Sequence, residues 1–259
     1  MGDPERDWRI WGNTDPYYAV LARPQFRRSA LDEYSLRQFF LSGQMHVDHV
    51  VDVLRRHFPH DHKLNHVLDY GCGVGRLVIP FAERFEHVTG IDVSPSMLEE
   101  ASRNTIQRNL QNVQLLSADK LDCLPAHSFD LIHSYIVFQH IPVNRGKRIL
   151  RRLLEILKPG GLGAIHVTFL RDASLARRVA AELRKRSDIA HRTLNFVRRR
   201  PLSDPPMQMN AYSLNNIFAM LFSQSCGPVY TEFFSQGDMR GIMLYFGGGE
   251  IVCINRLLR

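Results

Sequence analysis

The sequence lacks a long apolar run and it lacks paired cysteines. No stretch approaches the roughly eighteen apolar residues that a membrane-spanning helix needs. The first residues carry acids without an apolar segment, so we expect no secretory signal. The four cysteines are scattered and form no C-x-x-C pair, which argues against a disulfide framework and against a zinc site. These absences predict a protein of a reducing cytoplasm without a membrane span or a metal.

Acidic residues are scarce in one stretch of the chain. The 259 residues are 44% apolar, which is ordinary for one sizeable globular domain, and the net charge is +7. Residues 145–200 carry 16 Lys and Arg against 4 Asp and Glu. A stretch of this kind is typical of a solvated helix face, but it also suits contact with nucleic acid, an anionic membrane surface or an acidic substrate. Both interpretations stay open at this point.

Glycine is concentrated in the segment 67–75, which reads VLDYGCGVG. An apolar run ends there in Asp69 and is followed by alternate glycines, and the next apolar run ends in Asp92. Glycines at a strand-to-helix turn allow a ligand to lie directly against the backbone. A carboxylate at the end of the next strand offers acceptors to both hydroxyls of a ribose. The pattern therefore predicts a site for a ligand that contains a nucleoside.

The spacing of these glycines separates two classes of such ligands. The spacing is G-x-G-x-G here, whereas folds that bind the pyrophosphate of a dinucleotide use G-x-G-x-x-G. This difference argues against a nicotinamide-dependent dehydrogenase.

Four segments, in order and at suitable spacing, resemble the motifs of class I S-adenosylmethionine-dependent methyltransferases. Residues 67–75 resemble the first motif, and residues 90–97 (GIDVSPSM) resemble the second-strand motif. Residues 128–133 (SFDLIH) resemble the fourth-strand motif, and residues 157–161 (LKPGG) resemble the turn before the fifth strand. The sequence thus resembles the bacterial, small-molecule type of this family, and the resemblance implies S-adenosylmethionine as the cofactor.

Apolar runs alternate with helical patterns, which predicts an α/β fold with a doubly wound, mainly parallel sheet. The resemblance implies seven strands in the order 3-2-1-4-5-7-6, with an antiparallel seventh strand. Strands are expected at 67–70, 88–93, 113–118, 129–138, 162–169, 229–234 and 242–246. Helices are expected at 32–58, 77–85, 143–157 and 213–225, with Gly43 as a candidate break in the first, and turns at 159–161 and 247–249.

We expect three parts in the chain. Residues 1–62 form an N-terminal arm and helical cap, residues 63–170 and 207–259 form the Rossmann-like core, and residues 171–206 form a basic helical insertion. Residues 11–18 (WGNTDPYY) resemble the leader of some bacterial methyltransferases, and additions of this kind in the family tend to cover the active site. Tyr17 and Tyr18 are therefore candidates to face a substrate, with ordinary packing as the alternative.

The cofactor site is expected at the carboxyl ends of the strands, where doubly wound folds bind their ligands. The amino-acid part of the cofactor would lie along residues 71–75, with Asp69 favouring its cationic end. Asp92 would bind the ribose, and Asp119 would accept a hydrogen bond from the adenine amine, as the resemblance implies. The candidate cofactor-binding residues are Asp69, Gly71, Cys72, Gly73, Gly75, Asp92, Val93, Met97, Ala118, Asp119 and Tyr135. Cys72 is expected as a small residue in a crowded turn rather than as a nucleophile.

Methyl transfer from a sulfonium depends mainly on proximity and alignment. A base is needed only for a poorly acidic hydroxyl or a protonated amine. His140, beyond the expected fourth strand, is the candidate base, and a hydrogen bond that ties the loop before Pro142 is the alternative. Residues 134–138 read SYIVF instead of the N-P-P-Y of amide methylation, which disfavours DNA-adenine and glutamine N-methylation.

The favoured function is methyl transfer to a small-molecule or carbohydrate-like acceptor. An RNA methyltransferase that uses residues 145–200 is the first alternative, although Phe196 is the only aromatic residue there after Phe169. A methyltransferase-like partner subunit without catalysis is the second. The intact glycines of 67–75 and Asp92 argue against a decayed site of that kind.

Overall fold

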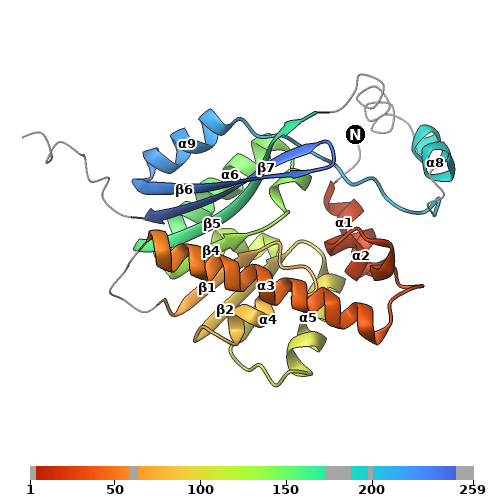
Figure 1. Ribbon diagram of the computed structural model, residues 1–259, viewed down its shortest axis with the longest axis horizontal. Coiled ribbons are helices and arrows are strands. Elements are labelled where there is room, and N and C mark those ends of the chain that lie inside the picture. The colour runs from red at the N-terminus through yellow and green to blue at the C-terminus, as the bar shows by residue number, and fades with distance from the viewer. Residues whose placement is uncertain (1–3, 59–63, 173–187, 198–200, 249–259) are drawn as a thin grey trace, which may run out of the picture.

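A seven-stranded sheet runs through the computed structural model, which describes residues 4–58, 64–172, 188–197 and 201–248 (Figure 1). The strand order is β3-β2-β1-β4-β5-β7-β6. The strands are β1 (His66–Tyr70), β2 (His87–Asp92), β3 (Val113–Ser117), β4 (Phe129–Ser134), β5 (Leu157–Arg171), β6 (Cys226–Gln236) and β7 (Met239–Gly248). Parallel pairing joins β3 to β2, β2 to β1, β1 to β4 and β4 to β5, and β7 is antiparallel to β5 and β6. The predicted fold class and strand order are confirmed.

Three helices cover one face of the sheet: α3 (Glu33–His57), α4 (Val78–Ala82) and α5 (Pro95–Ile106) (Figure 1). α3 places Val47, Val50 and Leu54 on one side, at helical spacing, and buries them against strand residues such as Val67 and Leu131. Each such side chain contributes about 1.5–3 kcal/mol when it is removed from water. α3 therefore packs directly on the sheet, although the sequence grouped it with the N-terminal cap.

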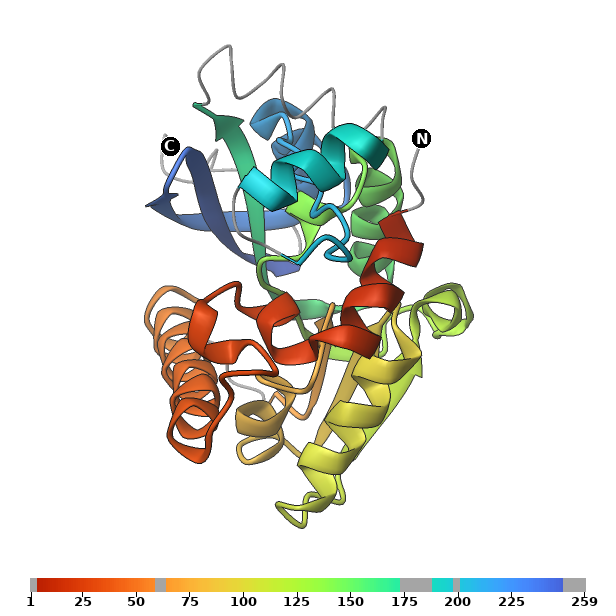
Figure 2. The same ribbon diagram turned by 90° about the vertical axis from the view of Figure 1, so that its right-hand side faces the viewer.

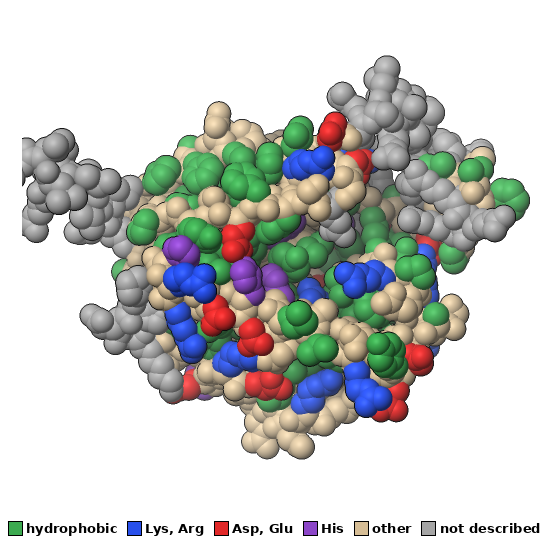
Figure 3. Space-filling view, in the orientation of Figure 1, with side chains coloured by type: hydrophobic (Ala, Val, Ile, Leu, Met, Phe, Trp, Pro, Cys, Tyr) green, Lys and Arg blue, Asp and Glu red, His purple; other side chains and the backbone are tan. Residues whose placement is uncertain are grey.

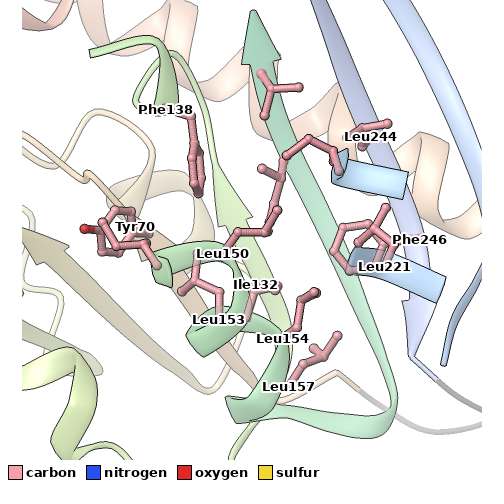
Figure 4. Packing of buried hydrophobic residues seen from close by; sticks show 14 of the residues in the cluster. Tyr70, Ile132, Phe138, Leu150, Leu153, Leu154, Leu157, Leu221, Leu244 and Phe246 are labelled. Carbon is pink, nitrogen blue, oxygen red and sulfur yellow. The ribbon is translucent and has the colours of Figure 1, made fainter. Parts of the chain in front are cut away.

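α6 (Val143–Ile156) and α9 (Leu214–Ser223) cover the opposite face. Figure 4 shows Leu150, Leu153 and Leu154 of α6 close to Ile132 of β4, with Leu221 of α9 near Phe246. These side chains are almost wholly buried. The sheet is thus covered on both faces, as a parallel sheet requires, and its strand ends remain available at one edge.

Gly43 does not interrupt α3, so the expected break is wrong. The helix runs without a gap over 25 residues and begins at Asp32, whose side chain accepts a hydrogen bond from the N–H of Ser35 at 2.7 Å. Gly43 is buried where α3 approaches the turn after β1. A Cβ atom on Gly43 would lie 2.2 Å from the carbonyl oxygen of Arg76. The close approach of two backbones, rather than a helix end, requires glycine at this position.

The N-terminal arm is helical although its sequence shows no clear periodicity. α1 (Pro4–Thr14) and α2 (Pro16–Val20) precede the short 3₁₀ helix η1 (Pro24–Phe26). In Figure 2, α1 and α2 lie across one end of the sheet, and α1 packs on α5. Trp11, Tyr17, Tyr18 and Phe26 form a buried cluster with Phe39 of α3. The arm is thereby fixed to the core by its aromatic residues.

Two glycine segments lie inside strands instead of in the expected turns. The pairing of β5 with β4 shifts between Leu157 and Leu162, so residues 159–161 form a bulge within β5. Gly247 and Gly248 belong to β7. Strand pairing across the sheet, which the sequence does not display, extends β5 through its glycines and β7 as far as Gly248; residue 249 is outside the described residues.

The expected basic insertion is described only in part. α8 (Asp188–Val197) lies within it, but residues 173–187, where a basic amphipathic helix is predicted, are outside the described residues. Within the part of the chain that the structure describes, no helix combines the length and the apolar character that a membrane span demands.

Candidate functional site

A cavity opens at the carboxyl ends of β1, β2 and β4, beneath the N-terminal arm. Its wall brings together most of the residues predicted for the cofactor: Asp69, Gly71, Cys72, Gly73, Asp92, Val93, Met97, Ala118 and Tyr135, and also the candidate base His140. The arm contributes Glu5, Trp8, Ala19 and Val20. The 3₁₀ helices η2 (Ala118–Cys123) and η3 (Phe138–His140) follow β3 and β4 at this edge.

The turn after β1 is held by its own backbone. The N–H groups of Gly71 and Cys72 donate to the carbonyl of Ile91 at 2.7 and 2.9 Å, and the N–H of Gly73 donates to Asp92 Oδ2 at 2.9 Å. The N–H of Gly75 donates to the carbonyl of Cys72. These four amides therefore already have acceptors. A ligand carboxylate placed along residues 71–75, as the sequence suggests, needs another donor.

Two valines lie against the glycines of this turn. Gly71 and Gly73 have φ angles of +80° and +53°, which non-glycine residues rarely adopt. A Cβ atom on Gly71 would lie 2.2 Å from Val137 Cγ2, and one on Gly73 would lie 2.7 Å from Val20 Cγ2. The space over the turn is thus partly filled by side chains, in contrast to the bare main chain that the sequence suggests. Both valines also line the cavity.

Asp92 sits at the end of β2 with both carboxylate oxygens engaged by backbone. Oδ1 accepts from the N–H of Ser94 and Oδ2 from the N–H of Gly73, each at 2.9 Å. Burial raises the pKa of Asp92, and these two hydrogen bonds oppose that shift. A carboxylate oxygen has a second lone pair. Asp92 is therefore oriented by the backbone, and its carboxylate has more acceptor positions than these two hydrogen bonds use.

Asp69 is oriented by a chain of two histidines. His133 Nδ1 donates to Asp69 Oδ1 at 2.8 Å, and His46 Nε2 donates to His133 Nε2 at 3.0 Å. Burial, followed by the neighbouring His133, lowers the pKa of His46 well below its usual value, so His46 is neutral. Asp69 Oδ2 is buried and has no hydrogen-bond partner among the described residues. This oxygen is therefore an enclosed acceptor without a partner, in a side chain that lines the cavity.

Sequence reasoning missed His133, His46 and Arg76. His133 and His46 have no local signal, because their partners lie far away in the sequence. His133 is 64 positions from Asp69 and 87 positions from His46, and only the fold brings these residues together. His133 is the only ionisable residue besides Asp130 in the strand β4, and a polar residue in a buried strand is the one clue. Arg76 directly follows the glycine turn and lines the cavity with only 5% of its surface exposed.

His140 lies in the cavity wall with both ring nitrogens engaged. Nδ1 donates to the carbonyl of Gln208 at 2.8 Å, and Nε2 accepts from Gln139 Nε2 at 3.1 Å. Burial lowers the pKa of His140 to about 4. Its ring packs edge-on to that of Trp8, with centroids 4.8 Å apart. The geometry shows the loop-tying hydrogen bond that the sequence offered as the alternative to catalysis.

Four of the candidate residues lie outside the cavity wall. The side chain of Asp119 is 67% exposed and pairs with Lys120 at 3.8 Å, beside a neighbouring hollow. Gly75 has a φ of +84° and faces Ala101 of α5. Tyr17 donates to Glu100 Oε1 at 2.7 Å, and the guanidinium of Arg27 lies 3.4 Å from the ring centre of Tyr18. The arm reaches the cavity through Trp8 and Val20 instead of through the two tyrosines.

No group of three or more His, Cys, Asp and Glu side chains is arranged to hold a metal ion among the residues that the structure describes. The polar groups of the cavity wall include an oriented carboxylate pair, Asp69 and Asp92, together with Arg76 and Tyr135. This set suits a nucleoside that carries a charged amino-acid group.

The sheet order and the cavity at its carboxyl edge define the class I methyltransferase fold. A family described as a methyltransferase domain matches residues 67–161, which span β1 to the start of β5. Residues 67–161 are thus similar to the methyltransferase domain of that family, within a sheet that has the class I strand order.

Several named proteins are similar to this chain. Aklanonic acid methyltransferase DauC from Streptomyces sp. (strain C5) is 38% identical over 99 residues, which cover 37% of this chain and 44% of that protein. Ubiquinone biosynthesis O-methyltransferase from Coxiella burnetii is 30% identical over 129 residues, which cover 46% of this chain and 52% of that protein. The chain thus spans about half the length of these relatives.

A solved structure has the same fold over nearly the whole chain. Magnesium protoporphyrin IX methyltransferase (ChlM) from Synechocystis PCC 6803, with bound S-adenosylhomocysteine, superimposes with a TM-score of 0.62 at 18% identity. The match covers 95% of this chain and 100% of that one. At this identity the likeness concerns the fold.

Proposed function

We propose that the protein transfers a methyl group from S-adenosylmethionine to a small-molecule acceptor. The observation that carries the proposal is the position of Asp92, which two backbone N–H groups orient at the cavity. A carboxylate held in this way is suited to the two hydroxyls of a ribose. The names of the similar proteins, which are methyltransferases of aklanonic acid and of ubiquinone biosynthesis, support a small-molecule acceptor.

The wall of the cavity offers a place for each part of the cofactor. Asp92 would bind the ribose, and Val93 and Met97 would pack on the adenine. Asp69, with its free Oδ2, would accept a hydrogen bond from the ammonium group. When bound, the cofactor supplies an electrophilic methyl group on a sulfonium. The protein then has to align the acceptor with that group and keep water away.

The part of the wall that remains for the acceptor is mainly apolar. Trp8 and Val20 from the arm, together with Ile136, Val137 and Ile141 after β4, line this side. Such a surface favours an acceptor with a flat apolar body. A carbohydrate-like acceptor, which the sequence also suggested, would leave hydroxyl groups against these side chains, where they lack partners.

His140 contributes more to the shape of this wall than to proton transfer. Its Nε2 lone pair is taken by Gln139, and its pKa of about 4 makes it a weak base. We propose that catalysis rests mainly on alignment, with His140 as a residue that holds η3 to the segment around Gln208.

The basic stretch gives no specific support to an RNA methyltransferase. Arg152 donates to the carbonyls of Leu121 and Leu124 and pairs with Glu155. Lys158 pairs with Asp130. Figure 3 shows the face that α3 covers, where positive and negative side chains are intermixed, whereas α6 covers the opposite face. Arg152 and Lys158 thus take part in contacts within the protein.

Isothermal titration calorimetry with S-adenosylhomocysteine tests the proposed function first. We expect saturable binding of one molecule per chain, and its absence would favour a scaffold role. The second step incubates the protein with S-adenosylmethionine and aromatic or carbohydrate acceptors, and follows by mass spectrometry the gain of one methyl group. Methylation of RNA in place of every small acceptor would contradict the proposal.

A further inference from the structure

We propose that Arg76 is the carboxylate-binding residue of the cavity. The carboxylate belongs either to the amino-acid part of the cofactor or to the acceptor. The inference rests on the proposed function, because it assigns a ligand group to the same cavity. Its starting observation is a buried guanidinium that lines this cavity and forms no ion pair with a described residue, although the charge of Asp69 acts on it from farther away.

The guanidinium of Arg76 has almost no partner in the protein. Its Nε is buried and lacks a hydrogen-bond acceptor, and Nη1 makes only a long contact of 3.4 Å with Ser42 Oγ. Over the described ranges of the chain, no carboxylate lies within 4.0 Å of it, whereas Arg27 pairs with both Asp15 and Asp204. Burial lowers the pKa of Arg76 to about 10, so the group is still charged at neutral pH. A buried charge without a partner costs several kcal/mol.

The fold holds this side chain firmly in place. Gly43 of α3 lies so close that an added Cβ atom would be 2.9 Å from Arg76 Cγ and 2.2 Å from its carbonyl oxygen. On the other side, the guanidinium carbon lies 6.0 Å from the ring centre of Tyr135. A pre-oriented guanidinium loses little freedom when a ligand binds, and its planar donors match a carboxylate in two places at once.

Several donors near the glycine turn are already engaged. The amides of Gly71, Cys72, Gly73 and Gly75 donate within the protein, and Arg145, the other arginine of the wall, pairs with Glu5. Arg76 Nε and Asp69 Oδ2 are enclosed polar atoms without a partner among the described residues, and both belong to side chains that line the wall. One donates and the other accepts. Together they complement the carboxylate and the ammonium of an α-amino acid.

The test compares Arg76→Met and Arg76→Lys with the wild-type protein by calorimetry. The probes are S-adenosylhomocysteine and 5′-methylthioadenosine, which keeps the nucleoside and the sulfur but has no amino-acid group. If Arg76 binds the cofactor carboxylate, Arg76→Met should lower the affinity for S-adenosylhomocysteine about 10- to 100-fold, since a hydrogen bond to a charged group is lost. Affinity for 5′-methylthioadenosine should stay unchanged. Arg76→Lys should recover part of the loss.

The second arm addresses the acceptor as the source of the carboxylate. Protein saturated with S-adenosylhomocysteine is titrated with benzoate. Normal affinity of Arg76→Met for S-adenosylhomocysteine, with loss of the benzoate binding seen in wild type, assigns the carboxylate to the acceptor. Two results together would overturn the proposal. The first is that Arg76→Met binds S-adenosylhomocysteine with normal affinity. The second is that benzoate fails to bind the wild-type protein, or binds the wild type and the variant equally.

A stability measurement separates a binding role from a structural one. Because Arg76→Met removes a buried charge that lacks a partner, its ligand-free melting temperature should equal or exceed that of wild type. Arg84→Met is the matched control, since Arg84 pairs with Asp48 outside the cavity wall and its replacement should leave the affinity for S-adenosylhomocysteine unchanged.

A wild-type protein that fails to bind S-adenosylhomocysteine contradicts the proposed function. Binding that Arg76→Met leaves intact, with no change for benzoate, contradicts only this inference.

Discussion

His133 donates a hydrogen bond to Asp69 across 2.8 Å, and both side chains are almost wholly buried. The two residues lie on adjacent parallel strands, where Asp69 of β1 is the direct register partner of His133 of β4. The contact orients the acid that ends the first strand toward the cavity. It also satisfies one carboxylate oxygen that would otherwise lie in the core without a partner.

Replacing His133 by Leu should destabilise the protein by about 3–5 kcal/mol, because Asp69 would be left as a buried charge without its partner. Urea unfolding at neutral pH measures the change. The double variant His133→Leu/Asp69→Leu should recover part of the loss. His87→Leu, at an exposed position of β2, serves as the control. A small effect in the single variant would mean that Asp69 does not depend on this bond.

His140→Ala should reduce turnover by less than about 10-fold, since a neutral histidine of low basicity contributes little to proton transfer. The protein should lose about 1–2 kcal/mol of stability with the hydrogen bond from His140 to Gln208. Steady-state kinetics and urea unfolding measure the two effects. A fall of about 10²-fold in turnover at unchanged stability and unchanged S-adenosylhomocysteine affinity would instead make His140 the general base.

Stability should decrease as the pH falls below about 6.5, partly because of His166. Burial, followed by the neighbouring His140, lowers the pKa of His166 to about 3. In the unfolded chain His166 takes up a proton near pH 6.5, whereas in the native protein it does not. Proton uptake therefore stabilises the unfolded state relative to the native state as the pH falls. Between pH 7 and pH 5 this group should account for about 2 kcal/mol.

The variant His166→Gln removes this titration. Its free energy of unfolding should fall less between pH 7 and pH 5 than that of the wild type, as urea titrations at both values would show. His87→Gln is the exposed control. An equal acid sensitivity in His166→Gln and wild type would contradict the assignment.

Gly73→Ala should lower the free energy of unfolding, because the added methyl group clashes with the N-terminal arm. The added Cβ atom would lie 2.7 Å from Val20 Cγ2, and the φ of +53° adds about 1–2 kcal/mol for a non-glycine residue. In a Val20→Ala background the clash should be relieved, although the backbone cost remains. A double-mutant cycle from urea unfolding should give a coupling of about 1 kcal/mol between the two positions. Strict additivity would mean that Val20 does not pack on the turn.

The sequence predicted those features that local patterns determine. The ends of the first three strands, the turn at Gly71 and the position of Asp92 follow from apolar runs that end in glycine and acid, and the structure places them at one edge of the sheet. The fourth strand was expected to reach residue 138 but ends at Ser134. The family resemblance supplied the strand order, which composition alone does not encode.

The remaining features depend on contacts between distant segments. Gly43 looked like a helix break because its contact with Arg76, 33 positions later, is invisible in the sequence. Asp119 looked like an adenine ligand, yet β3 ends at Ser117 and the following turn exposes the Asp119 side chain. The role of His133 depends on its hydrogen bond to Asp69, and the role of Arg76 depends on its place in the cavity wall. Neither is visible in the sequence.

The central claim, that Asp92 binds the cofactor ribose, is tested most directly by calorimetry of S-adenosylhomocysteine with wild type and Asp92→Ala. We predict a loss of about 1–3 kcal/mol of binding free energy, because hydrogen bonds to a charged group disappear. Circular dichroism should confirm that the variant is folded. Unchanged affinity in a folded Asp92→Ala protein would contradict the claim.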